Sequence, residues 1–258
     1  QTLITLLFEL KCHKGRFYLF TLISIILITL SGLIPNLVNP DLLPDTFNDF
    51  AYSQLSFINY IIIFGSFFFF GAIIAEEFQY KTYLILFPKI NELKLIVGKF
   101  LGNIILYLSV LSIYYLYYLI LGFIFFQQIS FEFFLSYLFT ILYGITVSTF
   151  ILVISSFMKS VSFSIIISFL LFFVVFNIIS TLLMLFLPYV EPIYLITYHG
   201  NMNIQIFNFP DVRYQELPFI FYMRIWLTPA IITNIFVLLI YIGFDLILSY
   251  LIFNLREL

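Results

Sequence analysis

Long apolar segments recur along the chain and are separated by shorter polar ones. Six of them are long enough to cross a bilayer as helices, because a hydrocarbon core of about 30 Å needs roughly 20 apolar helical residues. These segments are residues 17–35, 57–75, 97–126, 131–157, 161–187 and 227–253. Stretches such as SFSIIISFLLFFVVFNIISTLLMLF are apolar on every face, unlike the alternating strands of a membrane barrel. The pattern therefore predicts an all-α integral membrane protein with six transmembrane helices.

The composition agrees with a bilayer environment. Hydrophobic residues make up 63% of the 258 residues and charged residues only 9%, whereas a soluble domain carries about 25% charged residues. We therefore expect a single transmembrane domain over residues 1–258, with no sizeable soluble domain. The formal net charge of -2 gives no basis for nucleic-acid binding.

The basic residues predict an orientation. With six spans, both termini share one side of the membrane, and that side carries most of the lysines and arginines. They are Lys11, Lys14, Arg16, Lys81, Lys89, Lys94, Lys99, Lys159 and Arg256, against Arg213 and Arg224 on the other side. By the positive-inside rule the first side is cytoplasmic, so we expect a multi-pass plasma-membrane protein with both termini in the cytoplasm.

Three segments lie outside the predicted spans. Residues 1–16 place leucines at helical spacing, which is typical of a helix along the inner interface, although a simple approach to the first span fits equally well. The outer segment 36–56 contains two prolines and three aspartates and predicts irregular or short helical structure. The outer segment 188–226 is either a folded cap or a passive loop.

Enzyme chemistry leaves almost no trace in the sequence. Cys12 is the only cysteine, and His13 and His199 are predicted on opposite sides of the membrane, so neither a disulfide nor a shared metal site is expected. Gly98-Lys99 lacks the rest of a phosphate-binding loop. We therefore expect no catalytic residue, metal or cofactor on this chain, and any ATP hydrolysis must occur on another polypeptide.

Polar and small residues inside the spans are candidates for function or packing. Asp245 would be costly in the last span, so we expect it to pair with Lys159, Lys99 or Arg256, with a proton relay as the alternative. Four asparagines are expected to hydrogen-bond between helices. They are Asn59, Asn103, Asn177 and Asn234. Gly98 and Gly102 form a GxxxG pair that would let another helix approach closely.

The segment AEEFQYKTYLILFPKINELKLIVGKFLGN resembles the first cytoplasmic loop of type-2 ABC transporter permeases, the membrane subunits of exporter-type systems. In that family an acidic residue closes the second span, and a Gly-Thr pair, a Leu-rich segment, a proline, a charged helix and Gly-Lys follow. The matching residues here are Glu76, Glu77, Thr82, Leu84, Leu86, Pro88, Glu92, Leu93, Gly98 and Lys99. Lys81 stands where the family often has glycine.

The resemblance implies a permease subunit that works as a homo- or heterodimer with two ATP-binding cassette ATPase subunits, which carry the ATP and magnesium. The residues themselves predict a short amphipathic coupling helix after Pro88 in the loop 76–96, with Lys89, Glu92 and Lys94 on its polar side. Such a helix can dock on a soluble partner. The alternative is a charged loop that only marks the inner surface.

Two function classes follow. The first is an ABC permease that exports an apolar, lipidic or peptide substrate. The second is a stand-alone polytopic protein, such as an ion-coupled secondary carrier or a membrane anchor. Secondary carriers commonly show internal repeats and buried ionisable residues near the midplane, whereas here no convincing repeat is present and Asp245 is the only candidate acid.

Overall fold

The computed structural model describes residues 2–30, 44–81, 92–217 and 223–255. Within them, five helical runs are long and apolar enough to cross a membrane. These runs are Phe47–Gln79, Leu93–Phe126, Phe131–Phe157, Val161–Phe186 and Ile231–Leu255. The protein is therefore helical and of membrane type, and five of the six predicted spans coincide with these runs.

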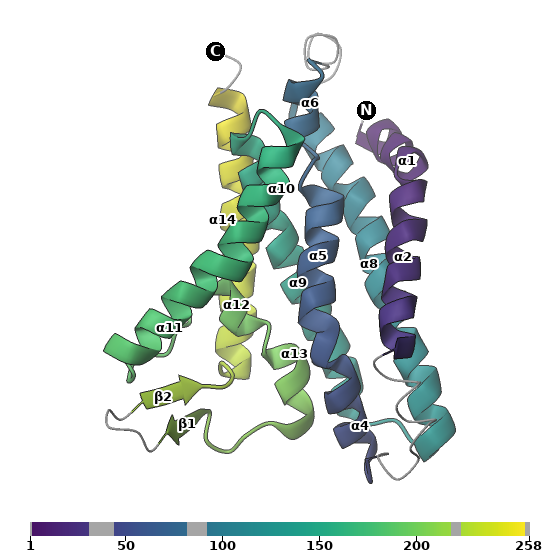
Figure 1. Ribbon diagram of the computed structural model, residues 1–258. Coiled ribbons are helices and arrows are strands. Elements are labelled where there is room, and N and C mark those ends of the chain that lie inside the picture. Colours follow the sequence, from purple (N-terminus) through teal and green to yellow (C-terminus); the bar gives the residue numbers. More distant parts are fainter. Residues whose placement is uncertain (1, 31–43, 82–91, 218–222, 256–258) are drawn as a thin grey trace.

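The predicted first span is described only in part. Helix α1 (Thr2–Cys12) is followed at His13 by α2 (Lys14–Ile28), which covers most of the predicted segment 17–35. Residues 31–35 lie outside the described part of the chain. Figure 1 shows α1 bent away from the direction of α2, and both helices lie beside α8 (Glu92–Phe126). The count of six spans stays a prediction.

The second helical run begins earlier than predicted. It starts with α4 (Phe47–Gln54) and continues through the 3-10 turn η3 (Leu55–Phe57), α5 (Ile58–Phe70) and α6 (Ala75–Gln79). Thr46 caps α4, because its hydroxyl oxygen accepts a hydrogen bond from the backbone N–H of Asp49 at 3.2 Å. The short helix α4 agrees with the short helical structure predicted within residues 36–56, and it continues into the second helical run.

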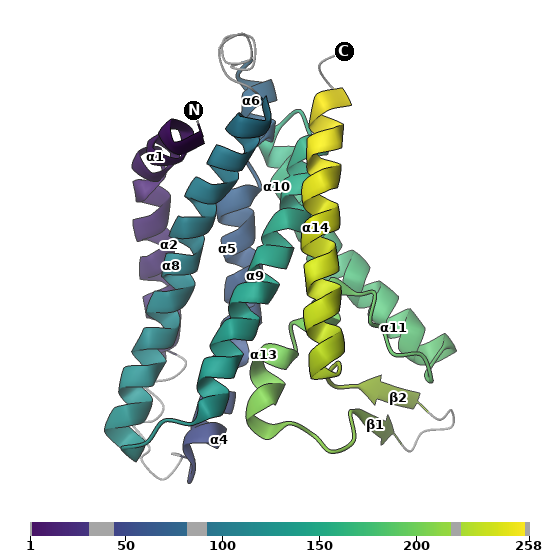
Figure 2. The same ribbon diagram turned by 180° about the vertical axis from the view of Figure 1, so that it is seen from behind.

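Helix α9 (Phe131–Phe157) forms the centre of the bundle. It lies between α5 and α14 (Ile231–Leu255) in both Figure 1 and Figure 2. Its hydroxyl side chains are buried, and several donate to the carbonyl one turn earlier, as Ser148 does to Gly144 and Ser156 does to Leu152. Small hydroxyl residues that satisfy their own hydrogen bonds let neighbouring helices pack closely in an apolar environment.

The fourth run leaves the bundle. It comprises α10 (Val161–Leu170), the π-helical segment η4 (Leu171–Val175) and α11 (Phe176–Phe186), and α11 buries none of its residues. Figure 1 shows α11 splayed away from α5 and α9. π-helical turns often bend helices, which fits the departure at this point.

The described residues of the segment 188–226, which are 188–217 and 223–226, are folded. They contain α12 (Ile196–His199), α13 (Met202–Gln205), the 3-10 turn η5 (Ile206–Asn208) and an antiparallel pair of strands, β1 (Tyr214–Leu217) and β2 (Met223–Trp226). Buried His199 bonds with one ring nitrogen to Asn234 Oδ1 and with the other to the Ile193 carbonyl, both at 2.7 Å. The all-α expectation is therefore corrected by one small hairpin, whose strands are too short to be recognised from alternation alone.

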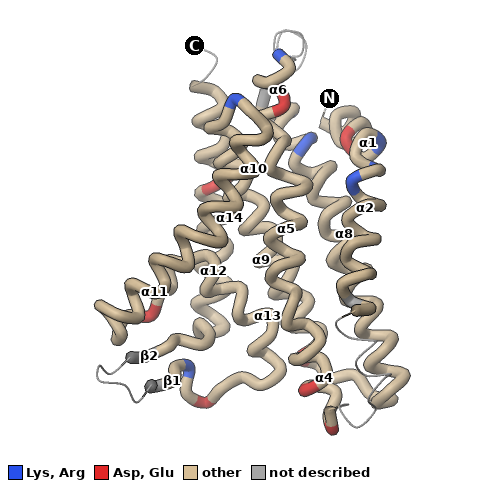
Figure 3. The backbone as a smooth tube through the Cα atoms, viewed as in Figure 1, with Lys and Arg blue, Asp and Glu red and all other residues tan. Residues whose placement is uncertain are grey.

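Charged residues gather at the two ends of the bundle. Figure 3 shows most of the lysines and arginines at the end where both termini lie, near α1, α6 and the start of α10. Arg213 lies at the other end, where Glu191 pairs with it at 2.8 Å. The middle of each span is almost free of charge, as a bilayer core requires.

Candidate functional site

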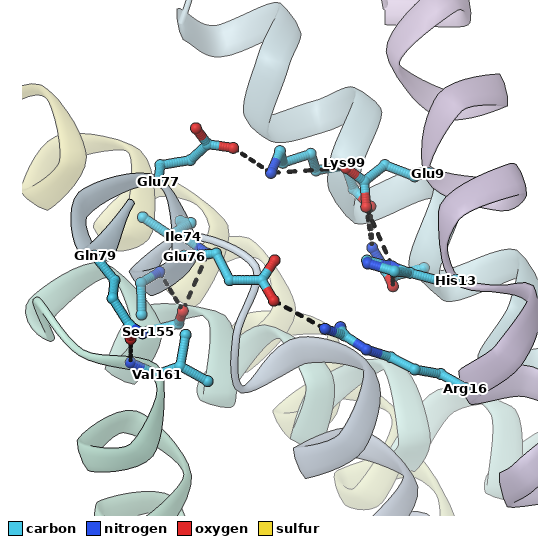
Figure 4. A network of polar contacts seen from close by, with 12 residues as sticks. Glu9, His13, Arg16, Ile74, Glu76, Glu77, Gln79, Lys99, Ser155 and Val161 are labelled. Carbon is cyan, nitrogen blue, oxygen red and sulfur yellow. Dashed lines mark hydrogen bonds and ion pairs between the residues drawn. The ribbon is translucent and has the colours of Figure 1, made fainter. Parts of the chain in front are cut away.

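A buried cluster of polar side chains joins α1, α6 and α8 near the end of the bundle that carries both termini. Its members are Glu9, His13, Glu77, Lys99 and Asn103, and Figure 4 labels the first four of them in close-up. We call this group the Lys99 cluster. The Lys99 ammonium pairs with the Glu77 carboxylate and lies 3.6 Å from Glu9 Oε1. Side-chain exposure is 12% for Lys99, 5% for Glu9 and 7% for Glu77, so these charges are largely shielded from solvent.

Neutral and histidine groups complete the cluster. Asn103 Nδ2 donates to Glu9 Oε2 at 3.1 Å and to the Lys99 carbonyl at 3.0 Å. His13 Nδ1 lies 2.9 Å from Asn103 Oδ1 and 3.3 Å from Glu9 Oε2. Buried carboxylates are tolerated when they are both paired and hydrogen-bonded, and Glu9 meets both conditions.

Close approach of two helices brings these groups together. An added Cβ at Gly98 would lie 2.8 Å from Thr5 Cβ, and one at Gly102 would lie 2.7 Å from Glu9 Cβ. Both distances are too short for real side chains, so α1 can lie at this distance from α8 only because both positions are glycine. The GxxxG pair thus faces α1, and Lys99 and Asn103 follow one residue after each glycine.

A second ion pair joins α2 to α6. Arg16 Nη2 donates to Glu76 Oε1 at 2.8 Å, and both side chains are about a quarter to a third exposed. Figure 4 shows this pair beside the Lys99 cluster. Adjacent glutamates on α6 therefore bond in two directions, Glu76 to α2 and Glu77 to α8.

The turn before α6 is also hydrogen-bonded to α9. Ser155 Oγ of α9 accepts hydrogen bonds from the backbone N–H groups of Ile74 and Ala75, both at 3.1 Å. Gln79 Oε1 accepts from the backbone N–H of Val161 at 2.8 Å and so satisfies one free donor at the start of α10. Helix α6 is therefore bonded to α2, α8, α9 and α10.

The predicted coupling helix is not a separate helix in the described residues. Thr82, Pro88 and Lys89 lie outside the described part of the chain, and from Glu92 onwards the backbone already belongs to α8. The side chain of Glu92 is likewise outside the description, and Lys94 is exposed. The sequence does not reveal where the third helix begins, because the apolar spacing after Pro88 continues without a break into the third span.

Leu93, Ile96 and Val97 were expected on the apolar side of that helix, and only Ile96 among them is buried. Leu93 and Val97 are exposed, whereas Leu95 and Ile96 are buried. The buried side of this part of α8 follows α1 and the two glycines, and no feature of the loop sequence signals that α1 lies there.

Lys81 takes the conformation that glycine favours. Its φ of 56° lies in the left-handed region, which costs about 1–2 kcal/mol for residues other than glycine. This is the position at which the permease family often has glycine, so the chain turns here although the side chain is lysine.

A scan of the chain against protein-family models gives no match, and a search among curated proteins gives none either. The resemblance to type-2 ABC permeases therefore depends on the loop residues quoted above.

The described residues hold no cluster of three or more His, Cys, Asp or Glu side chains placed to bind a metal ion. The Lys99 cluster is a charge-paired helix junction, because Lys99 of α8 contacts Glu77 of α6 and Glu9 of α1.

Asp245 pairs with neither Lys99 nor Lys159 in the described residues, and its third expected partner cannot be placed there. The Lys99 ammonium lies with Glu77 and Glu9 instead, Lys159 is exposed, and Arg256 is outside the described residues. Asp245 is 3% exposed, and Thr149 Oγ1 of α9 donates to its Oδ2 at 3.4 Å. In the described part of the chain it therefore faces a hydroxyl and no cation.

The intramembrane asparagines differ in what they bond. Asn103 bonds Glu9, Asn234 bonds His199, and Asn59 accepts from Asn203, so three of the four predicted residues join separate elements. Asn177 instead donates to the Phe173 carbonyl of its own helical run at 2.8 Å and is exposed. The sequence suggested all four as bonds between helices, and for Asn177 that expectation is wrong.

Sequence reasoning missed Glu9, His13 and Arg16 as members of the site. The signal was present, because the i, i+4 spacing of Glu9 and His13 places both on one face of a helix. Their partners, however, lie about 60 to 90 residues away along the chain. Only the packing of α1 on α8 brings them together.

Proposed function

We propose that this chain is the membrane-spanning permease subunit of an ATP-binding cassette exporter and is driven by separate ATPase subunits. The observation that supports this most is the bonding between described residues on either side of the segment 82–91. The loop begins after α6, whose Glu77 contacts Lys99, and it ends at α8, which carries Lys99. A force applied to the loop therefore acts on two spans that are already joined to α1.

The coupling follows from this connectivity. A partner that pushes on the loop displaces α6 and α8 together, because separating them would break a buried ion pair. Helix α1 moves with them, since Glu9 bonds Asn103 and contacts Lys99. In such an arrangement the nucleotide-driven motion of an ATPase enters at the loop and passes into several helices at once.

The rest of the proposal follows the sequence. The end with both termini is cytoplasmic because it carries the excess of lysine and arginine. The assembly is a dimer of permease subunits, identical or different, with two ATPase subunits that supply ATP and magnesium. The exported substrate is apolar, lipidic or peptide in nature.

The test is co-purification from native membranes. We expect the tagged chain to bring down a separate ATPase, the complex to hydrolyse ATP, and the isolated chain to show no hydrolysis. Glu92→Arg combined with Lys94→Glu should reduce both co-purification and ATP hydrolysis by the complex. Lys159→Glu, an exposed charge reversal at the same end, serves as the matched control and should leave both unchanged.

The outcomes are clear-cut. Absence of any ATPase in the purified material would refute the proposed assembly. Full activity of the double variant would show that the loop is not the contact.

A second function is favoured by one observation, the burial of Asp245 without a cation in the described residues. A buried acid near a hydroxyl is a common element of ion-coupled carriers. In that case purified chain in liposomes would move substrate with an ion gradient and without ATP, and Asp245→Asn would abolish the movement.

A further inference from the structure

A cavity of about 330 Å³ lies between α11 and the folded outer segment. One wall is formed by α11, including Asn177, Ser180 and Met184, and the opposite wall by the region of α12, α13 and β2. Its volume is at the lower end of the range in which small-molecule sites fall. Figure 1 shows that the end of α11 far from α10 lies near the β1–β2 hairpin.

The lining combines apolar groups with uncharged polar ones. Leu183 and Met184 come from α11, whereas Thr197, Asn201 and Gln205 come from the segment that follows it. No Lys, Arg, Asp or Glu lines the cavity within the described residues. The nearby Glu191 carboxylate is taken up by Arg213 and by the hydroxyl of Tyr198. Burial, together with that carboxylate, raises the pKa of Tyr198, so its phenol stays protonated as a hydrogen-bond donor.

Two lining groups lack the bonds that their positions call for. The indole N–H of Trp226 is buried and has no acceptor in the described part of the chain. Buried donors without a partner are rare and costly, and each calls for an explanation. Asn177 lies on a membrane-spanning run yet bonds only within that run, where its amide would otherwise meet lipid. The accessible amide of Asn177 therefore indicates a ligand that offers hydrogen-bonding groups, whereas the Trp226 nitrogen has almost no accessible surface and is closed to such a ligand in this structure.

The exposed surface of α11 beside the cavity indicates that the rest of the ligand is apolar. Helix α11 buries none of its residues, and large apolar side chains such as Leu182 and Phe186 are exposed along it. In a bilayer this surface contacts hydrocarbon chains. A molecule whose polar group enters the cavity can therefore keep an apolar chain beside α11.

We propose that this cavity binds the uncharged, hydroxyl- or amide-bearing head of an amphiphile whose alkyl chain lies along α11. The hydrogen-bond donors of the head reach the amide oxygen of Asn177. A charged head is disfavoured, because no opposite charge lines the cavity and transfer of an unpaired ion into it is costly. The inference concerns binding alone and does not depend on the proposed permease role.

Trp226 makes the proposal directly measurable. It is the only tryptophan of the chain, so intrinsic tryptophan emission reports from the cavity wall. The full chain in phosphatidylcholine vesicles is titrated with octyl glucoside, below the concentration that dissolves the vesicles, and separately with octyl sulfate. We expect the glucoside to cause a saturable change in Trp226 emission. The apparent affinity for the sulfate should be lower by a factor of roughly ten or more.

Two variants on one helix separate specific binding from partition into the bilayer. Asn177→Leu should weaken the apparent affinity for the glucoside about fivefold, which is the usual effect of one lost hydrogen bond. Thr181→Val changes an exposed hydroxyl one turn away that bonds the Asn177 carbonyl and does not line the cavity, so it should bind as the unchanged chain does. Circular dichroism verifies that both variants keep their helix content.

The proposal is overturned by a response that never saturates, by equal responses to both amphiphiles, or by an Asn177→Leu variant that binds as tightly as Thr181→Val. Because no ATPase or ATP is present, these results leave the proposed permease function untouched.

Discussion

Replacing Lys99 by methionine tests whether the buried cluster stabilises the junction of α1, α6 and α8. Methionine has a similar length and keeps the apolar stem, so the substitution removes mainly the ammonium group. The change leaves the carboxylates of Glu9 and Glu77 at side-chain exposures of 5% and 7% without this cation. Carboxylates this deeply buried gain little from solvent screening.

The expected loss can be bounded from the geometry. Removing one partner of a buried ion pair costs about 3–5 kcal/mol. Glu9 keeps its contacts with His13 and Asn103, so we place the cost at the lower limit, about 3 kcal/mol. This is a large share of the stability of a typical domain, about 5–15 kcal/mol.

The assay is denaturation of the purified chain in mixed micelles, followed by far-UV circular dichroism. Lys159→Met is the matched control, because Lys159 is exposed at the same end and its loss should change the free energy of unfolding by less than about 0.5 kcal/mol. Adding Glu77→Gln to Lys99→Met should recover about 1 kcal/mol or more, because it removes one of the buried charges. Equal stability of Lys99→Met and Lys159→Met would refute the reasoning.

Three further predictions use the same unfolding measurement. Gly102→Ala should lower the free energy of unfolding by about 1–3 kcal/mol, because the added Cβ meets Glu9. Gly243→Ala is the control: an added Cβ there meets nothing within 4 Å, so the change should be neutral or stabilising. Equal effects of the two substitutions would contradict the close contact of α1 and α8. Lys81→Gly should stabilise by up to about 1 kcal/mol because of its positive φ, and Lys81→Ala should not; a gain from both would argue against backbone strain. Asp245→Asn should be neutral or stabilising, because it removes a buried charge that has no cation in the described residues; a loss above about 1 kcal/mol would indicate a partner.

The spans were predictable because they depend on local composition. An apolar run of about 20 residues is sufficient evidence for a membrane helix whatever its neighbours are. The ends of the runs were less predictable. The capping bond of Thr46 extends the second run to Phe47, and α8 begins before the charges of the loop have ended.

The candidate site was predictable only in part. Glu77, Lys99 and the two glycines stood out, because each lies in a segment with a recognisable pattern. Their mutual contacts were not predictable. Lys99 could have met Asp245 by depth in the membrane alone, and the choice of Glu9 and Glu77 depends on which helix packs against the glycines. Sequence spacing gives the face of a helix and does not give its neighbour.

The arrangement of α8 explains why packing and charge occur together at this junction. Gly98 and Gly102 are separated by one turn, and so are Lys99 and Asn103, which makes two adjacent rows on one helix. The glycine row allows α1 to approach, and that approach brings Glu9 within reach of Lys99 and Asn103. A larger residue in the glycine row would move Glu9 away from both partners and leave the Lys99 ammonium with less negative charge around it. The close packing of α1 is therefore a condition for the ion pairs, and the ion pairs in turn join α6 to the same unit.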